Sequence, residues 1–376
     1  MKILFLVFHG FAEHNGISKK IFAQRDALAQ CGAEVRLCWL EIDEARNRKR
    51  MVDDLVLENY GSGLRGGIRS RIAYGALADY IVREGIGCVY LRYDHNASPF
   101  LTVMLCRLKR AGVGVAAEIP TYPYDREYDT LSLKFRVRHG FDRMFRRAVF
   151  RQVDRVVTFS GFDRIFGAPT VNISNGIDFS KVPIKSRIND TERELHLIGV
   201  AEIHPWHGFD RAISGLADYY AVPRDVQIYF HVVGEGDAAE REKLTRMAGD
   251  SGLGDRVIFH GAQAGTALDA LFERADMGVA SLARHRSGIT RIKTLKNREY
   301  AARGIPFVYS ETDEDFDGRD YVMKAPADET PLDMESILRF YRSRPFVPAE
   351  IRASVEGSLS WKMQMQKVLD AFTNKK

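Results

Sequence analysis

Short apolar runs alternate with longer amphipathic stretches along most of this chain, and no other feature limits its fold as strongly. Runs such as 2–8, 34–40 and 88–93 have the length of buried strands, whereas the stretches between most of them have the length of helices. A polar loop is expected over 41–70. Strands that alternate with helices form parallel sheets with right-handed crossovers, so we predict an α/β fold.

The alternation stops in the polar segment 179–194 and then begins again at 195–201. Two series of similar size predict two Rossmann-like domains whose parallel sheets face a central cleft. Ligands of open parallel sheets bind beyond the carboxyl ends of the strands, so this cleft is the expected site. We place the domains at 1–180 and 190–345, with a terminal helix in 346–376 that packs back on the first domain.

The chain has few features of a membrane-spanning or secreted protein. No apolar run reaches the ~20 residues that a membrane-spanning helix needs. The apolar opening ends at His9 and Gly10, which is typical of a buried first strand. The four cysteines have apolar neighbours and no CxxC spacing, so we expect free thiols in a reducing compartment and a cytoplasmic protein. They are Cys31, Cys38, Cys88 and Cys106.

Basic residues are concentrated in segment 134–151. Phenylalanines are interleaved with them, and Asp142 is the only acidic residue in the segment. Two interpretations remain open: a core-packed helix with a solvated basic face, or a face that attaches to anionic lipid head groups at the inner side of a membrane. No motif for nucleic acid accompanies the charge, so no nucleic-acid partner is expected. The basic residues are Lys134, Arg136, Arg138, Arg143, Arg146, Arg147 and Arg151.

Three places could hold phosphate through backbone N–H groups at the start of a helix. Gly16 opens the first expected helix, and Gly234 follows a strand in VVGEGD. The third place is the best, because a helix expected over 289–303 would carry three cations in its first turns, Arg291, Lys293 and Lys296. The residues that precede this helix or open it are Ser287, Gly288, Ile289 and Thr290.

Glu299 lies in the same expected helix, beside apolar positions. A carboxylate there needs a partner. One interpretation is an i,i+3 pair with Lys296, which would contribute little to stability. The other is a hydrogen bond to ribose hydroxyls, as acidic residues make in other nucleotide sites.

The order of several short motifs resembles the GT-B glycosyltransferases of glycosyltransferase family 4, and the likeness covers nearly the whole chain. Segments 118–129 and 205–211 also resemble a bacterial surface-polysaccharide branch of this family. The motifs are N-G-[VI]-D at 175–178, V-G-x-G at 233–236, V-x-F-x-G at 257–261, A-D-x-x-V at 275–279, E-[AY]-x-A-x-G-x-P at 299–306, and Ser-Trp at 360–361.

The resemblance implies an enzyme that moves a sugar from a nucleotide-diphosphate sugar to a glycan or lipid-linked acceptor, with retention of anomeric configuration, in cell-surface polysaccharide synthesis. The second domain would bind the nucleotide sugar and the first the acceptor. No Asp-x-Asp motif stands in a suitable place, so no metal and no cofactor are expected. A nucleotide-sugar epimerase on the same fold and a catalytically silent sugar-binding protein remain as alternatives.

The sequence departs from the family at the donor site. Ala201-Glu202 replaces a Gly-Arg pair, His207-Gly208 replaces Lys-Gly, and Arg291 replaces the first of two glutamates. Either the site is degenerate, or its positive charge has moved. In the second case we expect the β-phosphate against the amides of Gly288 to Thr290. Lys296, rather than Lys293, would reach it, and His207 would be a partial substitute. Glu202 would pair with Arg291 or turn away.

Two residues at strand ends are the catalytic candidates. His95 follows one strand and could face the cleft, or it could simply lie at a helix entry. Glu118 ends another strand just before an aromatic loop. A carboxylate with aromatic rings is a usual way to hold a sugar, although a loop acid is the alternative. The expected acceptor-binding residues of this loop are Thr121, Tyr122 and Tyr124.

Overall fold

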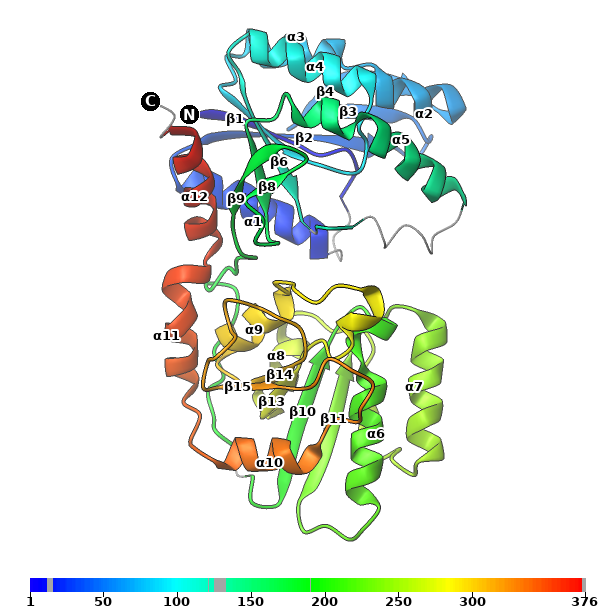
Figure 1. Ribbon diagram of the computed structural model, residues 1–376, viewed down its shortest axis with the longest axis vertical. Helices are drawn as coiled ribbons and strands as arrows, with labels where there is room; N and C mark the ends of the chain where they lie inside the picture. Colours follow the sequence, from blue (N-terminus) through cyan, green and yellow to red (C-terminus); the bar gives the residue numbers. More distant parts are fainter. Residues whose placement is uncertain (12–15, 121, 125–132, 190, 374–376) are drawn as a thin grey trace. The chain divides into compact units, whose positions relative to one another are not determined.

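The chain forms two compact units in the computed structural model, which describes all residues except 12–15, 121, 125–132, 190 and 374–376. The first unit comprises residues 1–174 and 361–376, and the second comprises 175–360. Each is an α/β unit with its own sheet and core (Figure 1). The predicted α/β class with two parallel-stranded sheets is therefore confirmed.

The described residues of the first unit form a nine-stranded sheet in the order β4-β3-β2-β1-β5-β6-β7-β9-β8. Within this order, neighbouring strands in the central part β2-β1-β5-β6-β7-β9 pair in parallel. The strands β3 and β4 at one edge and β8 at the other pair in antiparallel fashion. The strands are β1 (Lys2–Leu6), β2 (Glu34–Ile42), β3 (Arg48–Val52), β4 (Leu55–Gly61), β5 (Cys88–Arg92), β6 (Gly114–Ile119), β7 (Arg155–Thr158), β8 (Arg164–Ile165) and β9 (Ala168–Asn172).

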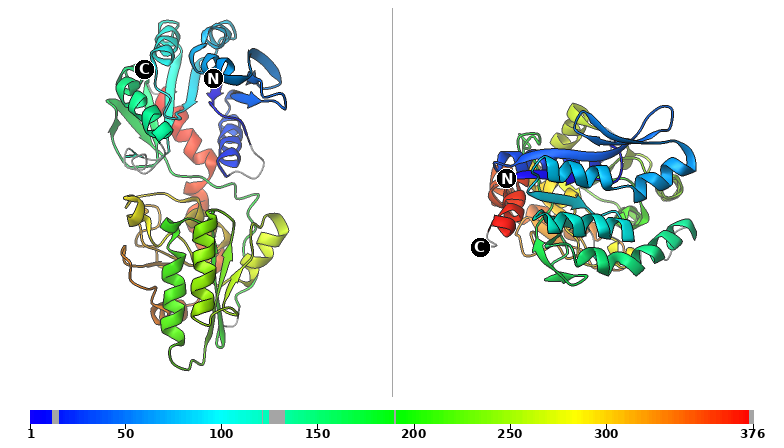
Figure 2. Two further views of the ribbon diagram at one scale, coloured as in Figure 1. Left: turned by 90° about the vertical axis from the view of Figure 1, so that its right-hand side faces the viewer. Right: turned by 90° about the horizontal axis from the view of Figure 1, so that it is seen from above.

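Helices cover both faces of this sheet. On one face, α1 packs beside α12, although α12 is the last helix described in the chain (Figures 1 and 2). Leu101 and Val149, from α4 and α5, join the core of the opposite face. The helices of this unit are α1 (Gly16–Gln30), α2 (Gly63–Ile72), α3 (Gly75–Arg83), α4 (Pro99–Arg110), α5 (Leu133–Phe150) and α12 (Trp361–Thr373).

The described residues of the second unit form a six-stranded parallel sheet in the order β12-β11-β10-β13-β14-β15. The strands are β10 (Glu194–Val200), β11 (Gln227–Val233), β12 (Val257–Phe259), β13 (Met277–Val279), β14 (Phe307–Tyr309) and β15 (Val322–Lys324). Because all six are parallel, the loops that follow them meet at one edge of the sheet. We call this the carboxyl edge.

Six α-helices and two 3-10 turns accompany the second sheet. The turns, η2 and η3, directly follow the loops after β10 and β13 and therefore lie at the carboxyl edge. The elements are η2 (Pro205–His207), α6 (Phe209–Tyr220), α7 (Ala238–Asp250), α8 (Gly265–Arg274), η3 (Arg284–Ser287), α9 (Leu295–Arg303), α10 (Met334–Arg342) and α11 (Pro348–Leu359).

Two sequence predictions of local structure are wrong. The segment 41–70 contains the hairpin β3–β4, whose turn places Asp53 at φ 48°. The helix expected over 289–303 begins only at Leu295, where the Thr294 side chain caps it. A parallel bridge between Arg291 and Thr312 holds the preceding residues in an extended conformation, so they cannot join the helix.

Candidate functional site

Four ionisable side chains, two of them buried and two partly buried, lie at the carboxyl edge of the second sheet. His207 ends η2, Arg284 begins η3, Lys296 lies in the first turn of α9, and Glu311 follows β14. Parallel strands bring these positions together, although His207 and Glu311 are more than 100 residues apart in the chain. We call these four residues the edge cluster.

His207 and Lys296 are in direct contact. The Lys296 Nζ lies 2.7 Å from the His207 Nδ1, and the His207 Nε2 lies 2.9 Å from the backbone oxygen of Glu202. A carbonyl accepts only from N–H, so Nε2 carries the proton and Nδ1 offers its lone pair to the lysine. Burial, followed by the charges of Lys296 and Arg284, lowers the pKa of His207 well below its ordinary value. His207 is therefore neutral and holds the lysine in place.

Lys296 is one of two cations in the edge cluster, together with Arg284. Burial lowers its pKa to about 7, and Arg284 acts in the same direction. It lies at the start of α9, where the backbone amides and the helix dipole also favour negative charge. Lys293 instead lies 3.8 Å from carboxylate oxygens of both Glu314 and Asp315. The choice of Lys296 over Lys293 as the phosphate ligand stays a prediction.

Glu311 was not singled out in the sequence. Its side chain is 2% exposed, and neither carboxylate oxygen hydrogen-bonds to another described residue. Burial raises its pKa to about 7, although its own backbone amide and the charges of Arg284 and Lys296 oppose this rise. Its only signal in the sequence was its place as the first of several acids shortly after a strand end, which is too common to be informative.

The residues Ser287–Thr290 do not lie at a helix start as predicted, and two of their amides already donate within the chain, while a phosphate role for this segment stays a prediction. The N–H of Gly288 donates to His285 O at 2.9 Å, and that of Ile289 donates to Arg284 O at 3.3 Å. These amides close the turn after η3, which Gly288 ends at φ 69°. The helix start lies seven residues after Gly288, so the first-turn amides belong to Leu295 and Lys296.

The expected pair between Glu202 and Arg291 is also wrong. Arg291 pairs with Glu314, because the bridge to Thr312 places both on the outer side of the same turn. Glu202 lies 3.5 Å from His204 and its side chain is 80% exposed. The alternative expectation, that Glu202 turns away, therefore describes it correctly.

Glu299 has a different partner from the one considered. Its Oε1 accepts a hydrogen bond from the Nε of Arg303, one turn further along α9, at 3.1 Å and lies 3.0 Å from the Nη2 of the same arginine. Lys296 is not its partner, since it contacts His207. Arg303 also binds Asp269 at 2.8 Å, which fixes the end of α9 against α8. A ribose-binding role for Glu299 stays a prediction.

Of the two other predicted glycines, Gly234 serves local structure, and a donor-binding role for Gly16 stays a prediction. A Cβ on Gly234 would lie 1.8 Å from the backbone oxygen of Ala201, and the Gly234 N–H already donates to Gly261 O at 2.8 Å. The close approach that needs glycine is thus made by the protein's own backbone, and not by a ligand. Gly16 begins α1 with open space around its Cα, but the residues 12–15 before it lie outside the described part of the chain.

In the first unit, the structure contradicts the catalytic assignment of Glu118. The side chain is completely buried. Its Oε1 lies 2.6 Å from Arg92 and 3.4 Å from Lys20, and its Oε2 accepts from Tyr90 and Gln24 at 2.6 Å each. Burial would raise the pKa of Glu118, but the two cations and these hydrogen bonds bring it below its ordinary value. Four donors leave no room for a sugar hydroxyl, so Glu118 anchors α1 to the sheet.

His95 follows β5 at φ 47° and packs among aromatic rings. Its ring centre lies 4.1 Å from that of Tyr124 and 5.7 Å from that of Tyr93. Burial lowers its pKa to about 4, so the ring is uncharged at neutral pH, and a catalytic role for His95 stays a prediction. The helix entry after it is capped by Ser98, whose Oγ accepts from the Leu101 amide.

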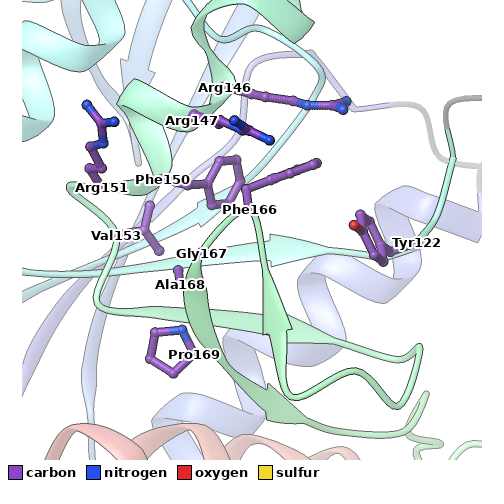
Figure 3. A pocket seen from close by; sticks show the side chains of 10 residues that line it. All are labelled: Tyr122, Arg146, Arg147, Phe150, Arg151, Val153, Phe166, Gly167, Ala168 and Pro169. Carbon is purple, nitrogen blue, oxygen red and sulfur yellow. The ribbon is translucent and has the colours of Figure 1, made fainter.

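The predicted acceptor residues lie in different surroundings. Tyr124 is buried beside His95, whereas Tyr122 is partly exposed and lines a hollow of about 670 Å³. Thr121 lies outside the described residues. Figure 3 shows the other side chains around the same hollow. They include Arg146 and Arg147 from the last turns of α5, Arg151 just beyond this helix, and the ring of Phe166. Its lining residues are Tyr122, Arg146, Arg147, Phe150, Arg151, Val153, Phe166, Gly167, Ala168 and Pro169.

Two further findings concern only the described residues. None of their helices is long and apolar enough to cross a bilayer. No group of three or more His, Cys, Asp or Glu side chains among them has the arrangement of a metal site.

Comparison with known proteins agrees with this architecture. Residues 194–339, most of the second unit, match the family model described as Glycosyl transferases group 1. Two structures match nearly the whole length of both chains: the lipopolysaccharide outer core galactosyltransferase WaaB (13% identity, TM-score 0.62, 100% of each chain) and HepE from Anabaena in complex with UDP (14% identity, TM-score 0.59, 99% of this chain and 100% of HepE).

A third structure, sucrose-phosphate synthase from Thermosynechococcus elongatus, has 15% identity and a TM-score of 0.68 over 99% of this chain and 98% of that one. A search of the curated proteins finds no match. The resemblance to GT-B glycosyltransferases and the predicted fold class are confirmed. The finer assignment to glycosyltransferase family 4 stays a prediction.

Proposed function

We propose that this protein transfers a sugar from a nucleotide-diphosphate sugar to a glycan or lipid-linked acceptor in cell-surface polysaccharide synthesis. One observation carries the proposal. Lys296 is held by a neutral histidine at the first turn of α9, within the region that matches the glycosyltransferase model. A partly buried cation at a helix start suits an anionic group.

The chemistry of the leaving group fits this arrangement. When the bond between the sugar and the diphosphate breaks, negative charge grows on the β-phosphate. Donors that are already in position stabilise such charge most effectively. The Lys296 ammonium and the first-turn amides of α9 would bind the β-phosphate, with Arg284 adding positive charge nearby. Within the proposal, these groups make a metal ion unnecessary, and retention of configuration rests on the family resemblance alone.

UDP is the first nucleotide to test, because HepE was solved with UDP and with UDP-glucose. Thermal shift with UDP, GDP and ADP would identify the nucleotide, since a ligand that binds only the folded state raises the unfolding temperature. The matching nucleotide sugar should then lose its sugar slowly to water. Failure of all three nucleotides to stabilise the protein would exclude the proposal. An epimeric nucleotide sugar formed without acceptor would identify an epimerase instead.

We further propose that α5 attaches the protein to an anionic membrane surface, where a lipid-linked acceptor would be found. Among the side chains of α5 that the structure describes, three apolar ones are exposed: Val137 (66%), Phe141 (49%) and Met144 (72%). Arg143 and Arg147 flank them on the same helix and are also exposed. Asp142, its one acidic residue, points inward and bonds to Tyr93. Adjacent apolar and basic stripes are the pattern of helices that lie on membrane surfaces.

A further inference from the structure

Glu311 is a buried carboxylate whose two oxygens have no hydrogen bond to another described residue. Such groups are rare in folded proteins, because a buried charge without hydrogen bonds is costly. Glu118 in the other sheet shows the usual solution, with four donors around one carboxylate. Glu311 therefore needs an explanation that the folded chain alone does not supply.

The backbone on both sides of Glu311 is firmly held. The Ser310 N–H donates to Ser281 O at 3.0 Å, and the Thr312 N–H donates to Thr290 O at 2.7 Å. The backbone oxygen of Glu311 accepts a hydrogen bond from the Lys324 ammonium. The position of this carboxylate is thus fixed by both neighbouring loops of the carboxyl edge and by β15.

The cations near Glu311 do not satisfy it. Lys296 is close enough for its charge to act on the carboxylate, yet its ammonium bonds to His207. The edge cluster therefore presents two different groups side by side: a cation at a helix start, and an acceptor that lacks a donor. A phosphate suits the first group and would be repelled by the second, which instead requires O–H or N–H.

We propose that Glu311 accepts a hydrogen bond from a hydroxyl of the transferred sugar. This inference rests on the proposed function, in which Lys296 binds the β-phosphate. The sugar is bonded to that phosphate, so its hydroxyls are the donors of the substrate closest to Lys296. Glu311 would then discriminate between nucleotide sugars by the position and orientation of one hydroxyl, since a buried acceptor rejects a ligand that leaves it unpaired.

The test compares UDP and UDP-glucose in calorimetry, with the GDP and ADP pairs as replacements if thermal shift selects another nucleotide. Glu311→Gln keeps the shape of the side chain and removes its charge. We expect UDP affinity to stay the same or increase, because an anion beside the diphosphate is gone. UDP-glucose affinity should fall at least about tenfold, the lower range for a hydrogen bond to a charged group. Glu314→Gln is the matched control and should change neither affinity more than twofold.

A second measurement does not depend on the folding of the variant. UDP-deoxyglucoses that each lack one hydroxyl are bound to the wild-type protein, and one of them should bind about tenfold more weakly than UDP-glucose. In Glu311→Gln that same deoxy donor should lose no further affinity, because the two changes remove one interaction.

The outcomes separate this inference from the proposed function. If no nucleotide or nucleotide sugar binds the wild-type protein, the proposed function fails. If both bind and Glu311→Gln changes the two affinities by the same factor, Glu311 is only a counter-ion of Lys296 and the inference is overturned. Equal binding of all the deoxy donors by the wild-type protein would also overturn it.

Discussion

The Lys296 ammonium lies 2.7 Å from the Nδ1 atom of His207, although 89 residues separate them in the chain. In the family that the sequence resembles, a lysine is usual at the position of His207. Here the histidine is buried and neutral, and it accepts a hydrogen bond from a lysine that a different element supplies. We therefore propose that the positive charge has changed its place in the sequence, while it stays at the carboxyl edge of the second sheet.

Replacement of Lys296 should affect donor binding more than replacement of Lys293. We expect Lys296→Ala to weaken UDP binding by about 1.5–3 kcal/mol, the range for a hydrogen bond to a charged group. Lys293→Ala is the matched control and should reduce UDP affinity little, because Lys293 lies between Glu314 and Asp315. Calorimetry measures both. If neither lysine matters and His207→Ala abolishes binding, the histidine itself is the ligand and the relocation of charge is wrong.

The parts of the fold that follow from periodicity could be predicted from the sequence. The strands and most helices have apolar patterns that local physics fixes, and Gly304 ends α9 in the left-handed conformation, as expected for a helix-ending glycine. The start of α9 could not be predicted, because it depends on the bridge between Arg291 and Thr312. A long-range backbone pairing of this kind leaves no local signal.

The same difference between local and long-range structure decides which residues of the candidate site could be predicted. Lys296 could be chosen from its helix position relative to Glu299, whereas Glu311 could not, since its isolation results from loops distant in the sequence. Glu311 was overlooked in the sequence, whereas Glu118 was assigned a function from the sequence alone. A carboxylate at a strand end looks functional in the sequence, but Lys20, Gln24 and Arg92 approach it only in the folded unit.

Neutralisation of Glu118 should destabilise the first unit. Glu118→Gln leaves the Lys20 and Arg92 charges at a buried site without their counter-ion, and removal of one partner of a buried ion pair costs about 3–5 kcal/mol. Urea unfolding at pH 7 measures the loss. Glu34→Gln, at an exposed pair with Lys2 and Arg36, is the control and should be nearly neutral. A stable Glu118→Gln protein without transferase activity would instead restore a catalytic role.

Three histidines predict a loss of stability of the second unit in acid. The His231 ring lies between His196 and His260, with N···N distances of 3.0 and 2.9 Å. Burial, followed by the neighbouring histidines, lowers the pKa of His231 to about 3. The unfolded chain takes up a proton near pH 6.5 and the folded chain does not, so stability decreases as the pH falls below about 6.5.

The measurement is urea unfolding at pH 7 and pH 5 of the wild-type protein and of His231→Gln. Between pH 7 and pH 5, the free energy of unfolding of His231→Gln should fall by about 2 kcal/mol less than that of the wild-type protein, because glutamine carries no charge. The comparison within each protein removes the effect of the substitution itself. An equal loss of unfolding free energy in both proteins would mean that the lowered pKa of His231 does not reduce stability in acid. Other groups would then cause the acid sensitivity.

The exposed stripes of α5 predict attachment to vesicles that contain anionic lipid. At low salt we expect the protein to sediment with vesicles containing phosphatidylglycerol and not with purely zwitterionic ones. Basic residues near such a surface contribute about 1 kcal/mol each, and salt screens this attraction. The double variant Arg143→Glu/Arg147→Glu should therefore lose attachment.

The matched control for this variant is Arg241→Glu/Arg246→Glu on the exposed side of α7, which changes the net charge by the same amount. It should sediment like the wild-type protein. If both double variants lose attachment equally, the vesicles sense only the net charge, and α5 is not the contact. If the wild-type protein stays in solution even at low salt, the basic face of α5 is a solvated surface, and the apolar exposure of Val137 and Met144 has no membrane role.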